Sequence, residues 1–291
     1  MTKAAIKYLV SILIIVQITF ISINVRAENI SQYRLDIKIF LEGAYIPNTG
    51  LMSTKIRKDK LLSETQPFAN NKFIGTIYGG FSIPNINNIA STQNVVDWVF
   101  IKFRSEQGYF IQYPVLLRND GYLLDPYNVI ADPNNPTLES GINLNALYSR
   151  LTARFPYSYP PNGINSLIFN FPREISVYHS NHLAILSKSI FSFYGSGTAT
   201  VDLTTPLGNA TVKASQARLN ASFPNDLAVY GMRVGDVNND GSIDASDRSI
   251  ARNTPDLANI NSVSDLNTDG SIDATDRNIA RTVPESVQQI I

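Results

Sequence analysis

The chain has 291 residues, with 24 basic and 24 acidic side chains, 44% hydrophobic residues and no cysteine. This balanced charge argues against nucleic acid or an anionic membrane as the main partner. The absence of cysteine excludes disulfides and thiol chemistry, and the length allows one large domain or several small ones.

Residues 1–27 have the order of features typical of a secretory signal peptide. Lys3 and Lys7 precede a mostly apolar stretch over 8–23, and Val25-Arg26-Ala27 offers a small-x-small cleavage site. Cleavage there would leave 21 basic against 24 acidic side chains. A retained membrane anchor is the alternative, because the apolar stretch is long for a signal peptide and short for a span. We therefore expect a secreted, extracellular bacterial protein, with association at the cell surface left open.

Residues 28–230 carry β-strand patterns over most of their length and are expected to form one antiparallel β-sandwich domain. The segment 95–104 is apolar on both faces, as in a central strand, and Asn119-Asp120-Gly121 is a favoured hairpin turn. Only 145–154 suggests a helical period. Strands are expected over 34–41, 95–104, 109–118, 122–124, 174–187 (one long strand or a bulged pair) and 198–203.

This region also resembles an uncharacterised β-module found near the C-termini of large exported bacterial proteins. The resemblance lies in three short phrases, Leu41 to Tyr45, Val95 to Val99 and Asn181-His182-Leu183, followed directly by a calcium-loop phrase at Gly235. It covers most of 35–235 and implies no activity that can be transferred.

His179 and His182 are the only histidines of the chain. Residues three apart in one strand point to opposite faces, so the pair is a poor metal site unless a bulge brings the rings together. We expect a structural role instead, in which Asn181 and His182 hydrogen-bond a corner of the sandwich.

No catalytic residue is predicted for the β domain. Asp97 has no visible acidic partner and is expected to orient a loop, while Glu42 is expected to close the first strand in a turn with Gly43. A carboxylate pair for sugar hydrolysis cannot be assigned from sequence.

Gly195-Ser196-Gly197 is predicted to be a flexible turn rather than a nucleophile elbow. Three loop aromatics are expected to pack on the domain rim, with stacking on sugar rings as the alternative: Phe155, Tyr157 and Tyr159.

The C-terminal region, 231–291, contains two copies of one segment, 236–255 and 265–284. Each copy opens with a twelve-residue loop that supplies oxygen atoms at positions 1, 3, 5, 7, 9 and 12, the pattern of an EF-hand Ca²⁺ loop. Gly241 and Gly270 occupy position 6, where the chain must turn sharply. The predicted metal ligands are Asp236, Asn238, Asp240, Ser242, Asp244 and Asp247 in the first copy, and Asp265, Asn267, Asp269, Ser271, Asp273 and Asp276 in the second. We expect two Ca²⁺ ions, and folding of the region coupled to their binding.

The flanks of each loop indicate half of an EF-hand. The residues before Asp236 favour no entering helix, but helices are expected over 245–252 and 274–281, stopped by Pro255 and Pro284. At position 8, Ile243 and Ile272 are expected to pair the two loops and face the core.

Tandem loop–helix units of this kind resemble a type I dockerin, the module that docks onto cohesin domains in extracellular assemblies. The resemblance covers about 233–285 and implies that the partner is held by loop positions 10 and 11 and by later turns of each helix. One departure is that Arg248 and Arg277 stand where dockerins usually have an apolar residue. The implied partner-binding residues are Ala245, Ser246 and Arg252 in the first copy, and Ala274, Thr275 and Arg281 in the second.

The sequence therefore predicts a secreted, non-enzymatic protein that docks a cohesin-like partner in the presence of calcium. Closure of the module onto its own β-sandwich is left open. One alternative is a glycoside hydrolase for which the module is an assembly tag. Another is a carbohydrate-binding or cell-surface matrix protein.

Overall fold

The computed structural model describes residues 34–70, 82–89, 93–104, 110–126, 139–143, 174–187, 198–205, 216–220 and 228–287. The predicted signal peptide, the helical pattern over 145–154, the loop aromatics and Gly195-Ser196-Gly197 lie outside these residues. Within the described ranges, none of the helices combines the length and apolar character needed to cross a bilayer.

The protein is mainly β, and its largest element is a six-stranded antiparallel sheet with the order β10-β9-β4-β5-β6-β7. Its strands are β4 (Val95–Arg104), β5 (Phe110–Arg118), β6 (Leu123–Asp125), β7 (Glu139–Ser140), β9 (Glu174–His179) and β10 (His182–Leu186). The predicted hairpin at 119–121 joins β5 to β6, and the predicted strand over 174–187 is a hairpin with a register shift.

A second sheet of three strands has the order β11-β1-β8, from β1 (Arg34–Lys38), β8 (Ile142–Asn143) and β11 (Thr198–Asp202). Strands β1 and β11 run parallel, which departs from the expected all-antiparallel arrangement, and β1 is shorter than the expected 34–41. The remaining β elements are β2 (Tyr45–Ile46), β3 (Leu51–Met52), β12 (Gln216–Arg218), β13 (Tyr230–Met232), β14 (Ser242–Ile243), β15 (Leu257–Ala258), β16 (Ser271–Ile272) and β17 (Ser286–Val287).

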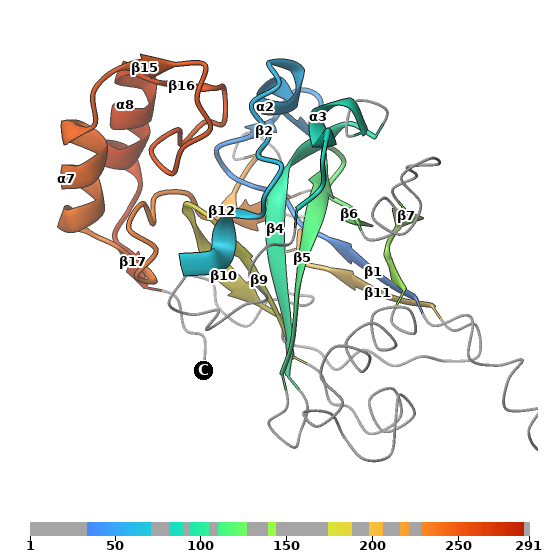
Figure 1. Ribbon diagram of the computed structural model, residues 1–291. Helices are drawn as coiled ribbons and strands as arrows, with labels where there is room; N and C mark the ends of the chain where they lie inside the picture. Colours follow the sequence, from blue (N-terminus) through green and yellow to red (C-terminus); the bar gives the residue numbers. More distant parts are fainter. Residues whose placement is uncertain are drawn as a thin grey trace, which may run out of the picture.

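The central strand β4 is buried on both faces, as its sequence predicts. Val99 and Ile101 join a core cluster with Ile37 of the three-stranded sheet. Trp98 and Phe100 face the opposite way, into a second cluster. That cluster is covered by α2 (Lys55–Lys58), the 3₁₀ helix η2 (Pro67–Asn70) and α3 (Ile86–Ile89). Helices α2 and α3 lie at the top of the view in Figure 1.

The C-terminal module contains the two predicted helices, α7 (Ala245–Asn253) and α8 (Ala274–Thr282), which contact each other side by side (Figure 1). Ile243 and Ile272 are buried, as expected, but they do not pair the two loops. Strand β14 pairs with β17, which follows the second helix, and β16 pairs with β15, which follows the first. Each loop is therefore closed by a strand that follows the helix of the other copy, so the two copies form one unit.

Candidate metal centre

The first loop is organised around the carboxylates at its two ends. Asp236 is buried, with 3% of its surface exposed, and its two oxygens accept the backbone N–H groups of Asp240 (2.9 Å) and Gly241 (3.0 Å). Asp247, in the first turn of α7, accepts the N–H groups of Asn238 (3.1 Å) and Asp244 (3.0 Å). Positions 1 and 12 of the loop thus face its backbone from opposite ends.

The second loop repeats this arrangement closely. Asp265, 1% exposed, accepts from the N–H groups of Asp269 (3.0 Å) and Gly270 (2.8 Å). Asp276 accepts from Leu266 and Asp273, both at 2.8 Å, and from Asn267 at 3.3 Å. All four hydrogen bonds of the first loop therefore recur with equivalent donors, and the bond from Leu266 is additional, so the duplicated sequence produces a duplicated geometry.

The turn of each loop depends on two residues with left-handed backbone conformations. In the first loop Asn239 has φ of 56° and Gly241 has φ of 85°, and in the second Thr268 and Gly270 have φ of 53° and 86°. Glycine adopts this region without steric cost and asparagine tolerates it. The glycine at position 6 was predicted from the sequence, and the left-handed residue at position 4 was not.

Each loop leads directly into a capped helix. Asp244 and Asp273, at position 9, are the N-cap residues of α7 and α8, and their side chains accept the N–H groups of Ser246 and Thr275. A carboxylate at a helix N-terminus also interacts favourably with the helix dipole. The residues proposed as ligands at positions 9 and 12 therefore also fix the start of the helix.

The loops place several negative charges close together at partly buried positions. Burial, together with the neighbouring carboxylates of Asp247 and Asp240, raises the pKa of Asp236 to about 7, although two backbone hydrogen bonds lower it. Burial likewise raises the pKa of Asp265 to about 7, with Asp276 and Asp269 as the neighbouring charges. A cation between these groups would remove the repulsion, and the donor set consists of oxygen atoms, which hard cations prefer.

Among the described residues, no three histidine or acidic side chains lie close enough together to hold a metal ion. Four aspartates of each loop are instead engaged with its backbone or with adjacent side chains. The Asn side chain at position 3 joins them in both copies, through Asn238 to Asp240 and Asn267 to Asp269, each at 3.0 Å.

The six predicted partner-binding residues are all exposed. Ala245, Ser246, Ala274 and Thr275 lie in the first turns of the two helices, and Arg252 and Arg281 lie in their last turns. Of the small apolar face predicted for the helices, Ala251 and Ala280 are buried, whereas Ile250 is 40% exposed.

Arg248 and Arg277 join the two copies, a role that the sequence did not reveal. Arg248 of α7 donates to the carbonyl oxygens of Ala280 (3.3 Å) and Val283 (3.2 Å) and pairs with Glu285 at 2.7 Å. Arg277 of α8 makes the corresponding contacts with Thr254 and Asp256. Each guanidinium thereby binds the C-terminal end of the other helix. We call these two sets of contacts the reciprocal clamps, and they stand where apolar packing was expected.

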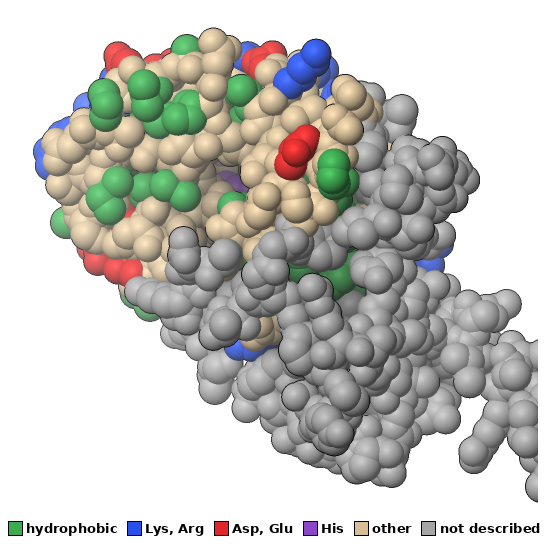
Figure 2. Space-filling model, in the orientation of Figure 1, with side chains coloured by type: hydrophobic (Ala, Val, Ile, Leu, Met, Phe, Trp, Pro, Cys, Tyr) green, Lys and Arg blue, Asp and Glu red, His purple; other side chains and the backbone are tan. Residues whose placement is uncertain are grey.

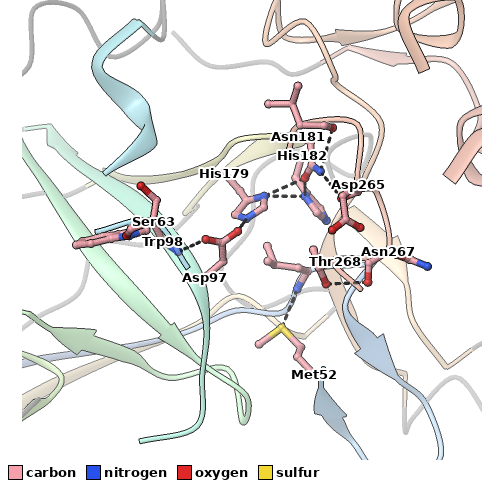
Figure 3. Close-up of polar contacts among 12 residues, drawn as sticks. Met52, Ser63, Asp97, Trp98, His179, Asn181, His182, Asp265, Asn267 and Thr268 are labelled. Carbon is pink, nitrogen blue, oxygen red and sulfur yellow. Dashed lines mark hydrogen bonds and ion pairs between the residues drawn. The ribbon is translucent and has the colours of Figure 1, made fainter. Parts of the chain in front are cut away.

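The second loop lies directly against the β domain. The side-chain amide of Asn181 donates to the carbonyl oxygens of Val263 (3.2 Å) and Asp265 (3.0 Å), as Figure 3 illustrates for the surroundings of Asp265. Gly43 packs so closely that a Cβ atom there would lie 1.7 Å from the carbonyl oxygen of Leu266. Leu183 of β10 belongs to the same buried cluster as Leu266.

The segment before the first loop is held by the same region of the β domain. The amide of Val234 donates to a carboxylate oxygen of Glu42 at 3.0 Å, and Gly235 donates to the carbonyl of Asn181 at 2.9 Å. Burial raises the pKa of Glu42. Residues 41–45 and 181–183 of the β domain therefore both contact the module, and we call this contact the joint. Glu42 sits in the expected turn and holds the module's first segment.

The expectation that His179 and His182 point to opposite faces is wrong. The chain reverses at Ser180 and Asn181, so the two histidines are direct cross-strand partners, and their rings lie 4.7 Å apart. Their Nδ1 atoms are 2.9 Å apart, and both approach the side-chain oxygen of Asn181. Figure 3 shows His179 between His182 and Asp97, whose carboxylate lies 3.4 Å from His179 Nε2. Asp97 also accepts from the amide of Trp98.

Comparisons with family models, with curated proteins and with solved structures found no match for this chain.

Proposed function

We propose that the chain is a secreted calcium-binding protein whose C-terminal module docks a partner protein when calcium is bound. In this proposal residues 231–291 form a type I dockerin-like module with one Ca²⁺ in each loop, and residues 28–230 form a β-sandwich that carries it. The exposed residues of α7 and α8 contact a cohesin-like domain. Export is assigned to residues 1–27 on their sequence pattern alone.

The observation that carries the proposal is the duplicated placement of the carboxylates at loop positions 1 and 12. Asp236 and Asp247, like Asp265 and Asp276, face the same short stretch of backbone from its two ends. An EF-hand loop uses these two positions to close around its ion. Burial, with a smaller contribution from neighbouring carboxylates, raises the pKa of Asp236 and Asp265, so a cation beside them would stabilise the fold.

The joint with the β domain supports a second contact for the same module. Because Asn181 and Gly43 touch the second loop, this loop is engaged within the chain, while the exposed helix residues remain available to a second protein. We therefore propose that the module has one intramolecular contact and one docking face.

Isothermal titration of residues 28–291 with calcium, followed by circular dichroism in calcium and in chelator, tests this function. We expect two ions per chain and a loss of helical signal in chelator. The variant with Asp247→Ala and Asp276→Ala serves as the control that should bind neither ion. A wild-type protein that takes up no calcium, or whose spectrum and proteolysis pattern ignore the chelator, would refute the proposal.

A further inference from the structure

A groove of about 480 Å³ runs between the two helices of the module. Its walls come from both copies of the repeat, so it exists only when α7 and α8 are packed together. Four of its six lining residues are arginines, and the other two are small or polar: Arg248, Arg252, Ala274, Arg277, Asn278 and Arg281.

The groove has more positive charge than the chain itself neutralises. Arg248 and Arg277 are engaged with Glu285 and Asp256, two exposed carboxylates at the ends of the clamps. Arg252 and Arg281 are exposed, and among the described residues no ion pair holds either guanidinium. In Figure 2 the visible face of the module is mainly tan and green, with acidic and basic side chains at its edges. Four arginines around one groove are therefore a local concentration of charge.

The spacing of the arginines matches an extended polypeptide. On each helix the two arginines are four residues apart, which places them about 6 Å apart along the axis at a rise of about 1.5 Å per residue. Alternate side chains of an extended strand repeat after about 6.6 Å and point the same way. An extended peptide with a carboxylate at every second position could therefore place one acid at the exposed Arg252 or Arg281. Its next acid would lie beside Arg248 or Arg277, which also pair with Glu285 and Asp256.

We propose that this groove binds an extended acidic segment of the partner protein, with carboxylates at alternate positions. The proposal rests on the proposed docking function and specifies the chemistry of its partner. Guanidinium groups bind carboxylates through paired, charge-assisted hydrogen bonds, so each arginine recognises geometry as well as charge. Ala274 contributes only a methyl group to the lining of the groove.

Fluorescence anisotropy with a labelled Glu-Ser repeat peptide tests the groove on the full chain 28–291 in saturating calcium. We expect binding that weakens as salt is raised, and roughly tenfold weaker binding to the variant with Arg252→Ser and Arg281→Ser. A Gln-Ser repeat peptide should not bind. The matched control is Lys58→Gln, an exposed cation on α2 away from the groove, which should bind as the wild type does.

The outcomes separate this inference from the docking function on which it rests. If calcium folds the module but the Glu-Ser peptide does not bind, or binds the double variant equally well, the groove proposal is overturned while calcium-dependent docking stands. Stronger binding of polygalacturonate than of the peptide would also overturn it, in favour of an acidic glycan. If the module takes up no calcium, the proposed function fails first. Because Arg252 and Arg281 are exposed, unchanged circular dichroism of the double variant verifies that it is folded.

Discussion

His179 and His182 are brought together by two residues, Ser180 and Asn181, that reverse the chain without a glycine or proline. Burial lowers the pKa of His182 well below its ordinary value, and repulsion by His179 lowers it further. The titratable neighbours on this side are His179 and, beyond it, Asp97. His182 therefore stays neutral in the fold under conditions in which an unfolded histidine is already protonated.

This difference predicts a loss of stability on acidification. An unfolded histidine takes up its proton near pH 6.5, so the contribution of His182 is fully present above about pH 6.5 and declines below it, by up to about 1.4 kcal/mol per pH unit. Urea denaturation of the wild type and of His182→Gln, in saturating calcium between about pH 7 and pH 5.5, measures this term. We expect a shallower pH dependence in the variant, and parallel curves would contradict the assignment.

At the scale of elements, the reciprocal clamps explain how two nine-residue helices form a stable pair with so few apolar residues. Isolated helices of this length are unstable in water, and Ala251 and Ala280 are the only apolar residues buried along these two. The contacts of Arg248 and Arg277 with the opposite helix ends supply what the small core lacks.

Replacement of Arg248 by methionine isolates the clamp, because it keeps an unbranched apolar side chain and removes the hydrogen bonds. We expect Arg248→Met to destabilise the module by about 1–2 kcal/mol, since two carbonyl contacts and one partly exposed ion pair are lost. Thermal melting of the helical signal in calcium provides the measurement. Arg252→Met is the control, and an equal effect of the two substitutions would show that the clamp contributes nothing.

Local patterns in the sequence predicted most of the module and of the strands, but not their long-range contacts. The loops, both helices, the turn at Gly241 and the strand β4 follow from residues close together in the chain. The pairing of β14 with β17 and the clamp of Arg248 link residues more than 30 positions apart, and no local pattern specifies them. The sequence does not predict the reversal between His179 and His182. Two-residue hairpin turns usually contain residues with a positive φ, such as glycine or asparagine, and in this turn neither Ser180 nor Asn181 has a positive φ.

At the scale of the whole molecule, the two loops are alike in sequence but unequal in surroundings. Only the second loop receives the amide of Asn181 and the close approach of Gly43. A ligand that binds the folded form alone stabilises every contact that depends on that form. Calcium in the second loop is thus expected to stabilise the contacts of that loop with Asn181 and Gly43, whereas calcium in the first is expected to act on α7 and on the segment before the loop.

Hydrogen exchange of two single variants tests this inequality. In calcium, Asp276→Ala is expected to speed exchange at the amide of Leu183, whose side chain shares a buried cluster with Leu266 of the second loop, by roughly tenfold or more. The equivalent change in the first loop, Asp247→Ala, is the matched control and should leave this amide largely protected. Equal acceleration in both variants would mean that the loops act as a single unit.

The exchange of closing strands between the repeats has a consequence for biosynthesis. Ile243 of the first loop pairs with Ser286, and the clamp of Arg248 reaches Glu285, so the first repeat is completed by the last residues of the described chain. A ribosome that still holds residues 284–287 therefore holds a first repeat that cannot close. Folding of this repeat is in this way postponed until residues 284–287 are free to pair with it.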